Sequence, residues 1–267
     1  MNKPIAVIDS GVGGLTVVRE IIRQLPREEI VYFGDTARCP YGPRPREEVR
    51  LFSLQMLDYL SQFDPKLIVI ACNTATAVIL EELHHSAQTP VVGVIHPGVR
   101  AAIKATLLGR IGVIGTEGTI ASGLYEEALR LIHPHLYIKS LACPDLVPLV
   151  EEGEYHTPKA YQIVRSSLEP LLNEDLDTLI LGCTHYPILA PLIQEVMGEN
   201  VKLISSADET AREVSTILFH KKMLSQKFER PKHLFITSGD KTKFKRIAEV
   251  WLDMSVNVHQ VSLVSHA

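Results

Sequence analysis

The chain lacks the cysteine pairs and basic tracts that mark several classes of protein. Its 267 residues include only four cysteines, at positions 39, 72, 143 and 183, and no two of them form a C-x-x-C pair. This spacing predicts neither a disulfide framework nor a zinc knuckle, so reduced thiols are expected. The formal net charge is −4, and lysine and arginine form no basic run, which argues against nucleic acid or a membrane surface as the partner. A small molecule is therefore the expected partner.

Long apolar runs are also missing. The N-terminal segment MNKPIAVIDSG contains an apolar run of only five residues before Asp9, which is too short for the apolar region of a signal peptide or for a membrane span. We therefore expect a cytoplasmic protein. Hydrophobic residues make up 46% of the chain and charged residues 22%, a balance typical of a protein that buries a core in one large domain or two small ones.

Short β-branched runs alternate with segments of helical periodicity. Predicted strands occupy 5–8, 30–33, 67–71, 91–95, 111–114, 137–141, 178–181, 201–204, 233–236 and 256–261. Predicted helices include 15–25, 46–63, 74–84, 158–172 and 243–252. Buried strands that alternate with helices predict an α/β fold of parallel sheets with helices on both faces.

Two cysteine motifs repeat one design. VIACNTA at 69–75 and LILGCTHYP at 179–187 each place a cysteine and a threonine between a hydrophobic strand and a helix. Open α/β sheets bind their ligands outside the carboxyl ends of the strands. Two similar sheets that face one another would bring Cys72 and Cys183 together across a cleft, although this position alone does not establish a function.

A pair of thiols in this position suits racemisation. Each cysteine precedes a helix, the second one expected to begin at Pro187, and a helix N-terminus favours the thiolate form. Racemisation needs a base and an acid on opposite sides of one carbon, with roles that exchange in the reverse direction, and two thiols with unperturbed pKa values near ~8.5 meet that need. The alternative is that both cysteines are small buried hydrophobic residues. Cys39 and Cys143, each followed by proline, are expected to be structural.

The glycine-rich segment D-S-G-V-G-G at 9–14 follows the first strand and opens a helix. It resembles an anion-binding loop, but the sixth position of a G-x-G-x-x-G pattern is occupied by Thr16, and no G-x-x-x-x-G-K-[ST] phosphate loop occurs in the chain. A dinucleotide site is the alternative interpretation. We favour a close approach of the backbone to a carboxylate, with Asp9 in a polar role near the thiol, unless Asp9 only caps the following helix.

Two further segments carry candidate substrate contacts. The loop R-C-P-Y-G-P-R-P at 38–45 is too rich in proline for a helix or a central strand. Within it, Pro40, the Tyr41 hydroxyl and the Gly42 N–H are candidates, and a rigid surface turn is the alternative. Thr116 and Thr119 follow the strand that ends at 114, where their hydroxyls could bind a carboxylate or merely begin the next helix.

His185 and Glu151 could assist proton transfer at Cys183. A histidine in a loop is often only a hydrogen-bonding neighbour, and spacing alone does not distinguish Glu151 from Glu152. Metal binding by Cys183 and His185 is not expected, because no third or fourth ligand is arranged near them in the sequence.

Taken together, four motifs resemble the glutamate racemases. They are D-S-G-V-G-G (9–14), G-D-T-A-R-C-P-Y-G (34–42), A-C-N-T-A (71–75) and L-G-C-T-H-Y-P (181–187), in the order of that family. With segments 146–153 and 237–251, the resemblance covers essentially the whole chain. It implies an enzyme that needs neither pyridoxal phosphate nor a metal, interconverts L- and D-glutamate, and supplies D-glutamate for bacterial peptidoglycan.

The resemblance also implies an architecture and roles for residues. Two similar α/β domains, residues 1–96 plus 208–267 and residues 97–207, would enclose the active site in the cleft between them, and the protein would be a homodimer. Cys72, served by Asp9, would exchange the proton on the D-glutamate side, and Cys183, served by His185 and Glu151, on the L-glutamate side. The implied substrate contacts are Asp9, Ser10, Tyr41, Gly42, Asn73, Thr74, Thr184 and His185.

Three other activities remain open on the sequence. A related racemase that acts on aspartate or another acid would share the two thiols and differ in its pocket. A thiol hydrolase that uses one cysteine and His185 would form an acyl-enzyme and tolerate the loss of the other cysteine. A ligand-binding protein of two domains would bind glutamate without exchanging its α-proton.

Overall fold

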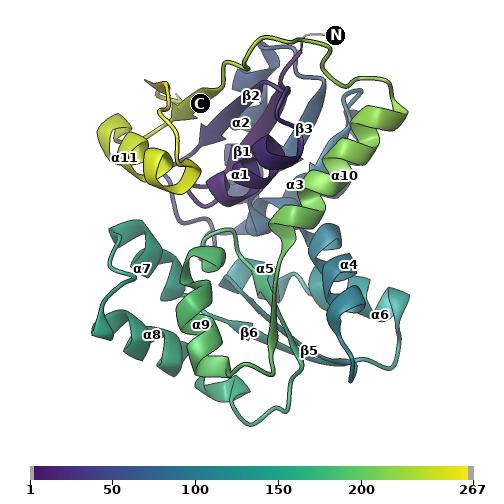
Figure 1. The fold of residues 1–267 in the computed structure, drawn as a ribbon, viewed down its shortest axis with the longest axis vertical. Helices are drawn as coiled ribbons and strands as arrows, with labels where there is room; N and C mark the ends of the chain where they lie inside the picture. Colours follow the sequence, from purple (N-terminus) through teal and green to yellow (C-terminus); the bar gives the residue numbers. More distant parts are fainter. Residues whose placement is uncertain (1–2, 264–267) are drawn as a thin grey trace.

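The chain folds around two separate parallel sheets (Figure 1). A computed structural model describes residues 3–263. The six-stranded sheet has the order β10 (Val258–Gln260), β9 (Leu234–Thr237), β2 (Ile30–Gly34), β1 (Ile5–Asp9), β3 (Leu67–Ile70), β4 (Val91–Gly93). The four-stranded sheet has the order β6 (Tyr137–Ala142), β5 (Arg110–Gly115), β7 (Thr178–Gly182), β8 (Lys202–Ser205). Every strand pair in both sheets is parallel, so the predicted α/β class is confirmed.

Helices cover both faces of each sheet. Those around the six-stranded sheet are α1 (Leu15–Gln24), α2 (Arg46–Ser61), α3 (Asn73–Ser86), α10 (Ser206–His220) and α11 (Lys241–Leu252). Those around the four-stranded sheet are α4 (Ile95–Ala105), α5 (Glu117–Ala121), α6 (Leu124–Ile132), α7 (Leu146–Glu152), α8 (Pro158–Leu168) and α9 (Ala190–Met197), with 3-10 turns η1 (Glu169–Leu171) and η2 (Tyr186–Leu189).

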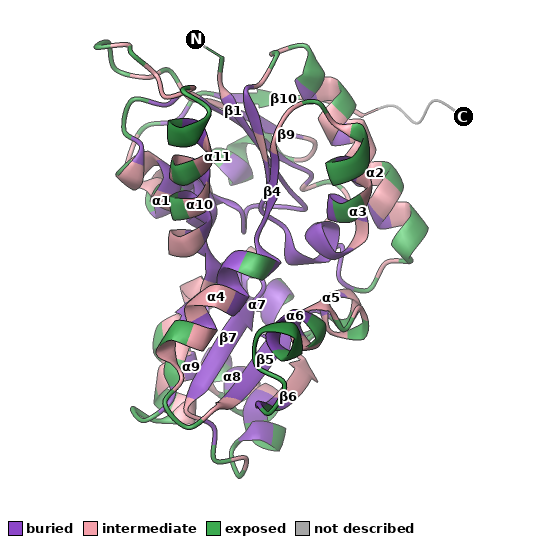
Figure 2. Ribbon diagram, turned by 90° about the vertical axis from the view of Figure 1, so that its right-hand side faces the viewer, coloured by how far each residue is buried: buried purple, intermediate pink, exposed green. Residues whose placement is uncertain are grey.

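Strand β1 shows why this arrangement forms. Alternate side chains of a strand point to opposite faces of its sheet. Ile5 and Val7 pack into one core with α1, α10 and α11, whereas Ala6 and Ile8 pack into a second core with α2 and α3. Both faces of the strand are therefore buried (Figure 2), which explains why its sequence is continuously apolar instead of alternating.

Several predicted boundaries shift in the structure. The strands predicted at 201–204 and 256–261 lie at Lys202–Ser205 and Val258–Gln260. The helix predicted at 158–172 is wrong at its end, because α8 stops at Leu168 and continues as the 3-10 turn η1. Pro170 has no backbone N–H to donate to the preceding turn, so an α-helix cannot pass through it undisturbed.

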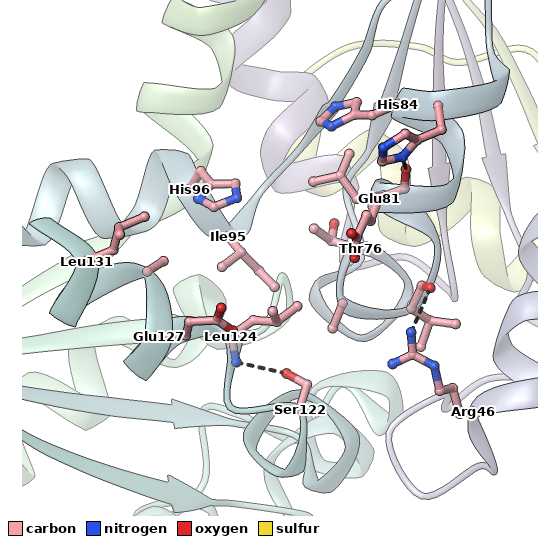
Figure 3. A pocket seen from close by; sticks show the side chains of 15 residues that line it. Arg46, Thr76, Glu81, His84, Ile95, His96, Ser122, Leu124, Glu127 and Leu131 are labelled. Atoms are coloured by element: carbon pink, nitrogen blue, oxygen red, sulfur yellow. Dashed lines mark hydrogen bonds between the residues drawn. The ribbon is translucent and has the colours of Figure 1, made fainter.

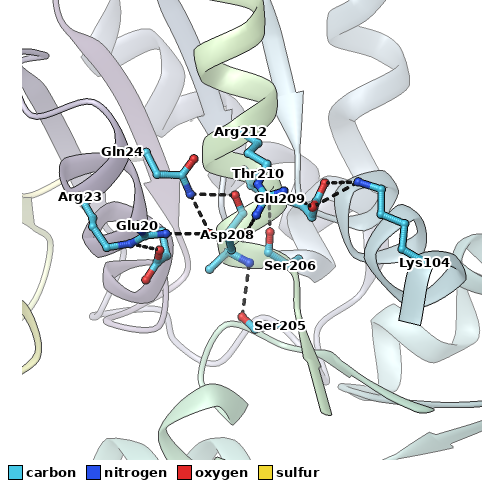
Figure 4. A network of polar contacts seen from close by, with 11 residues as sticks. Glu20, Arg23, Gln24, Lys104, Ser205, Ser206, Asp208, Glu209, Thr210 and Arg212 are labelled. Carbon is cyan, nitrogen blue, oxygen red and sulfur yellow. Dashed lines mark hydrogen bonds and ion pairs between the residues drawn. The ribbon is translucent and has the colours of Figure 1, made fainter. Parts of the chain in front are cut away.

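Helix α10 joins the two halves of the molecule. It follows β8 of the four-stranded sheet and packs against both α1 and α4. At its first turn, Asp208 accepts hydrogen bonds from Arg23 at 2.8 Å and from Gln24 at 2.9 Å (Figure 4). On the other side, Glu209 lies 3.3 Å from Lys104 of α4. The helix thus carries polar contacts to both neighbours.

We expect the Asp208 contacts to contribute little to stability. The side chains of Arg23 and Asp208 are 60% and 40% exposed, and an exposed ion pair contributes less than about 1 kcal/mol because water and salt screen it. Asp208→Asn should therefore lower the free energy of unfolding by less than about 1 kcal/mol in urea denaturation. A larger loss, or one that salt does not reduce, would show that stability depends on the ion pairs of Asp208 with Arg23 and Arg212.

Among residues 3–263, no helix is both long and apolar enough to cross a membrane.

Candidate active site

The candidate residues gather where strands of the two sheets end. Asp9 is the last residue of β1, and Cys72 follows β3 and caps α3. Cys183 follows β7 of the other sheet. The two sets meet directly, because the Thr184 hydroxyl donates to the Asp9 carboxylate at 3.2 Å. The strands of both sheets are parallel, and their carboxyl ends meet at one junction. Residues that are distant in sequence therefore become neighbours there.

Cys72 lies in a closed environment beside an acid. Its Sγ accepts a hydrogen bond from the Ala75 N–H at 3.4 Å, and its thiol contacts the Ser10 hydroxyl at 3.6 Å. Burial, followed by the Asp9 carboxylate, raises the pKa of Cys72 to about 12, and the hydrogen bonds from Ala75 and Ser10 offset this only in part. The N–H at the start of α3 thus lowers the pKa of Cys72 as expected, but burial and the Asp9 charge outweigh it.

Asp9 is held by the glycine-rich loop. Its Oδ2 accepts the Gly11 N–H at 2.9 Å, and the Gly14 N–H also bonds to the carboxylate. Burial raises the pKa of Asp9, although these donors and the nearby His185 act in the opposite direction. The alternative that Asp9 caps helix α1 is not supported, because the capping residue is Gly14 and α1 has no side-chain cap.

Cys183 has a different partner, a histidine paired with a carboxylate. The His185 Nδ1 lies 3.7 Å from the Cys183 Sγ, and its Nε2 lies 2.8 Å from Glu151 Oε1. Burial alone lowers the pKa of His185, but its contacts with Cys183 and Glu151 outweigh burial and place the pKa well above the usual value. For Glu151, burial acts upward, but the hydrogen bond and charge of His185 hold the pKa below the usual value. Each partner therefore favours the charged form of the other.

The helix expected to begin at Pro187 begins three residues later in the structure. Residues Tyr186–Leu189 form a 3-10 turn, and α9 begins only at Ala190. The Cys183 carbonyl accepts the Tyr186 N–H at 3.2 Å, so Cys183 precedes a tight turn and is not the cap of an α-helix. Its charge partner is His185 and not a helix dipole.

Three threonine hydroxyls connect α3 to the segment that follows β5 of the four-stranded sheet. The Thr74 Oγ1 lies 2.8 Å from that of Thr116 and 3.3 Å from that of Thr119, and Thr116 and Thr119 are 3.0 Å apart. Thr116 also caps α5 by accepting the Thr119 N–H. The predicted helix start is therefore confirmed at Thr116, whereas binding of a carboxylate by these hydroxyls stays a prediction.

Asn73 has an unused donor in this region. Its Oδ1 accepts the hydroxyl of Tyr125 at 2.7 Å. Its buried Nδ2 has no hydrogen-bond partner within the described residues. A buried amide without a partner costs about 1–3 kcal/mol, so this nitrogen is a natural donor to a bound ligand.

The proline-rich loop reaches across to the second sheet. The Gly42 carbonyl accepts the Gly118 N–H at 2.9 Å, and a Cβ on Gly42 would lie 2.6 Å from the Thr116 Cβ. The Tyr41 hydroxyl is buried and donates to Asp35, so its contacts in the structure do not support the prediction that this hydroxyl binds the substrate. Pro40 follows a cis peptide bond in the same loop. The groups that this loop can offer a ligand are its backbone N–H and C=O groups.

Comparison with known proteins identifies the family. The family described as Asp/Glu/Hydantoin racemase matches residues 5–214. A glutamate racemase of Bacillus cereus is 58% identical over 264 residues, which are 98% of each chain. The structure of glutamate racemase isoform RacE1 from Bacillus anthracis superposes with a TM-score of 0.95 at 53% identity, again over 98% of each chain.

The chain belongs to the glutamate racemase family. A more distant member, glutamate racemase from Francisella tularensis in complex with D-glutamate, superposes with a TM-score of 0.91 at 33% identity over 99% of each chain. The resemblance inferred from the four sequence motifs is confirmed, as is the predicted fold of two α/β halves.

Some residues beside the thiols were not apparent from the family motifs or from spacing. Tyr125 lies on α6 and had no local signal, because it reaches Asn73 only through the folding of the second sheet onto α3.

Cys39, expected to be structural, has its thiol 3.7 Å from Glu151 Oε1. The prediction about metal ligands concerned Cys183 and His185 as a pair, whereas the structure groups His185 with Cys39 and Glu151 and leaves Cys183 outside that group. The ambiguity between the two glutamates is resolved, since Glu152 is exposed.

The cavity between α3 and the helices α4 and α6 is separate from these residues (Figure 3). It measures about 530 Å³ and is lined by residues such as His84, His96 and Leu131. None of the residues predicted from the family motifs lines it. The cavity is therefore distinct from the candidate site at the strand ends.

The His185–Glu151 pair predicts a titration shift. Glu151→Gln removes one of the groups that hold the pKa of His185 up, so this pKa should fall and the imidazolium should be lost at lower pH than in the wild type. Side-chain NMR of histidine, with His185→Asn to assign the signal among the 11 histidines, measures the change. Glu152→Gln, which alters an exposed neighbour, is the matched control and should titrate like the wild type.

Proposed function

We propose that this protein is a glutamate racemase that interconverts L- and D-glutamate without a cofactor, with Cys72 and Cys183 as its two acid/base thiols. The observation that carries the proposal is the pair of buried thiols at strand ends of two sheets, each with its own proton partner, in a member of this family. Asp9 lies near the first thiol, and the His185–Glu151 pair serves the second.

The chemistry requires one group on each face of the α-carbon. In the L-to-D direction, Cys183 takes the α-proton, and Cys72 donates a proton to the opposite face. A Cys183 thiolate is stabilised by the imidazolium of His185 at 3.7 Å, while the raised pKa of Cys72 keeps that thiol protonated and ready to donate. In the D-to-L direction the roles exchange, and Asp9, whose own pKa is raised, assists Cys72 in giving up its proton.

The proposed substrate contacts are the polar groups around the thiols. They are Asp9, Ser10, Tyr41, Gly42, Asn73, Thr74, Thr184 and His185, with Pro40, Thr116 and Thr119 as further contacts. Asn73 supports this assignment through its unpaired Nδ2. The start of α3 supplies N–H groups and a dipole that favour a carboxylate, and the threonine hydroxyls can turn their protons toward a second one. For Tyr41 and Gly42 the contact is through the backbone.

Glutamate is favoured over aspartate by the relatives. Those described above are glutamate racemases, and the Francisella tularensis protein was solved with D-glutamate. The solved aspartate racemase of Picrophilus torridus is only 20% identical, with a TM-score of 0.55, and supports the fold alone.

The remaining features of the proposal follow from the resemblance. We propose a cytoplasmic homodimer that supplies D-glutamate for peptidoglycan. We propose two domains, 1–96 plus 208–267 and 97–207, the outermost residues 1–2 and 264–267 lying outside the described part. The packing of α10 on both α1 and α4 supports a division near its first turn.

A substrate panel tests the proposal. Protein dialysed against a chelator, with no pyridoxal phosphate added, is incubated with L-glutamate, L-aspartate and L-alanine while optical rotation is followed. We expect loss of rotation with L-glutamate alone. Rotation lost only with L-aspartate would make the aspartate alternative correct, and a need for pyridoxal phosphate or metal would refute the cofactor-independent mechanism.

A further inference from the structure

A cluster of three ligand types lies on the outer side of His185. The Cys39 Sγ, a Glu151 carboxylate oxygen and a His185 ring nitrogen all lie within 4.8 Å of one another. They come from the loop after β2, from α7 and from the turn after β7. The sulfur lies 3.7 Å from Glu151 Oε1, and His185 Nε2 lies 2.8 Å from the same oxygen.

These atoms have nearly the spacing of a zinc site. Bond lengths of about 2.3 Å to sulfur and about 2.0–2.2 Å to nitrogen and oxygen place tetrahedral ligands about 3.4–3.6 Å apart. The Cys39–Glu151 distance of 3.7 Å is slightly longer than this separation, and the imidazole needs to retreat from the carboxylate by about 0.6 Å to admit the ion. A mixed set of sulfur, nitrogen and oxygen ligands suits Zn²⁺ and not the oxygen-seeking Mg²⁺ or Ca²⁺.

The backbone keeps room for the cluster. A Cβ on Gly11 would lie 2.8 Å from Glu151 Oε1 and 2.9 Å from the Cys39 sulfur. Only glycine at this position allows both side chains to approach one another over the loop. The cluster therefore depends on Gly11 of the glycine-rich segment and is not a chance grouping of exposed side chains.

A cavity beside α11 borders Glu151, the one member of the cluster that lines it. It measures about 250 Å³ and is lined by Glu151 together with Ala37 of the Cys39 loop and with Asp240 and Lys243 at the start of α11. Asp240 and Lys243 bring one negative and one positive charge to this cavity, and the charge of Lys243 also acts on Glu151. Cys39 is half-buried, and the Glu151 side chain is 19% exposed, so two of the three ligands are accessible from outside.

We propose that Cys39, Glu151 and His185 form an inhibitory Zn²⁺ site. The ion binds the Cys39 sulfur, a Glu151 oxygen and His185 Nε2, and water takes the fourth position. Binding releases the proton of the Cys39 thiol and the Nε2 proton of His185 to solvent, with no change of oxidation state. Cys183 lies at the opposite ring nitrogen, Nδ1, so the second thiol is not a ligand.

Inhibition follows from the displacement of His185. The ion takes Nε2 and separates the ring from Glu151, which holds it at 2.8 Å, so the opposite nitrogen, Nδ1, no longer keeps its position 3.7 Å from the Cys183 sulfur. Only this consequence rests on the proposed function, because the metal binds whether or not the protein is a racemase.

Metal binding is measured directly by calorimetry with Zn²⁺ and by absorption spectroscopy with Co²⁺, whose charge-transfer band reports a thiolate ligand. Wild-type protein and Cys143→Ser, which removes a buried thiol outside the cluster, should both bind and show the band. Cys39→Ser should lose the band and bind Zn²⁺ at least about 10- to 100-fold more weakly, since losing a ligand costs no less than losing an outer partner of a ligand. Cys39→Ala repeats the test without a hydroxyl that could replace the sulfur.

Inhibition is then measured against the metal-free rate of each variant. We expect Zn²⁺ to inhibit wild type and Cys143→Ser reversibly, with chelator restoring the rate, and to inhibit Cys39→Ser only at much higher concentration. Equal inhibition of Cys39→Ser and wild type would overturn the proposal, as would absence of Zn²⁺ binding by active wild-type protein. Zinc binding through Cys39 in a protein with no racemase activity would retain the metal site and refute the proposed function.

Discussion

Cys72→Ala and Cys183→Ala should each lower the rate of glutamate racemisation by about 10²- to 10⁴-fold in both directions, the range that one acid/base group contributes. Each direction needs both thiols, one as base and one as acid, so loss of either stops inversion. Cys143→Ala is the matched control, because it also removes a buried thiol, and within residues 3–263 this thiol contacts the carbonyls of Leu141 and Ser167 and no candidate residue. Its rate should remain close to that of the wild type.

The two alanine variants should differ in the exchange that they retain. In Cys72→Ala, Cys183 can still remove the proton of L-glutamate and return one to the same face, so L-glutamate should slowly acquire deuterium in D₂O without inversion. Cys183→Ala should do the same with D-glutamate only. NMR of the α-position measures both. A variant that still racemises at the wild-type rate would remove its thiol from the mechanism and reopen the one-cysteine alternative.

Gly13→Ala should lower the rate by about 10²-fold, the cost of misplacing a reacting group by roughly 1 Å. A Cβ at Gly13 would lie 2.5 Å from His185 Nδ1 and would also contact the Thr184 hydroxyl. The ring cannot simply retreat, because Glu151 holds its other nitrogen at 2.8 Å. The imidazole must therefore move away from Cys183. We expect the substitution to lower kcat strongly and the thermal midpoint only slightly.

A double-mutant cycle with His185→Asn tests this explanation. If the added methyl group acts by displacing the imidazole, Gly13→Ala should have a much smaller effect in the His185→Asn background, where the ring is absent. Equal proportional losses in both backgrounds would show that the methyl group acts elsewhere in the glycine-rich loop.

Much of the fold follows from sequence because its signals are local. Continuous apolar runs such as 5–8 become strands buried on both faces, and the helical segments between them have the expected period. Boundary errors arose where one residue decided the geometry, as at Pro170 after α8. The sequence carries no local mark of which residues of the second sheet meet α3, because that contact depends on how the two sheets face one another.

The candidate site was predictable in its motifs and less so in its electrostatics. The strand–cysteine–threonine pattern identified Cys72 and Cys183 as a pair, but their surroundings differ. Burial beside Asp9 raises the pKa of Cys72 to about 12, whereas Cys183 has a histidine partner. A pKa depends on desolvation and on charges from distant segments, so spacing alone could not reveal this asymmetry. The same limitation concealed the approach of Cys39 to Glu151.

The most direct test of the two-thiol account is racemisation of L-glutamate in D₂O, stopped early in the reaction, with the α-position of each enantiomer analysed separately. The proton removed by Cys183 does not return to the opposite face, which receives its hydrogen from Cys72. We therefore predict that the first D-glutamate formed carries deuterium at the α-carbon. D-glutamate that retains the original protium would mean that a single group carries the proton across, and it would contradict the account.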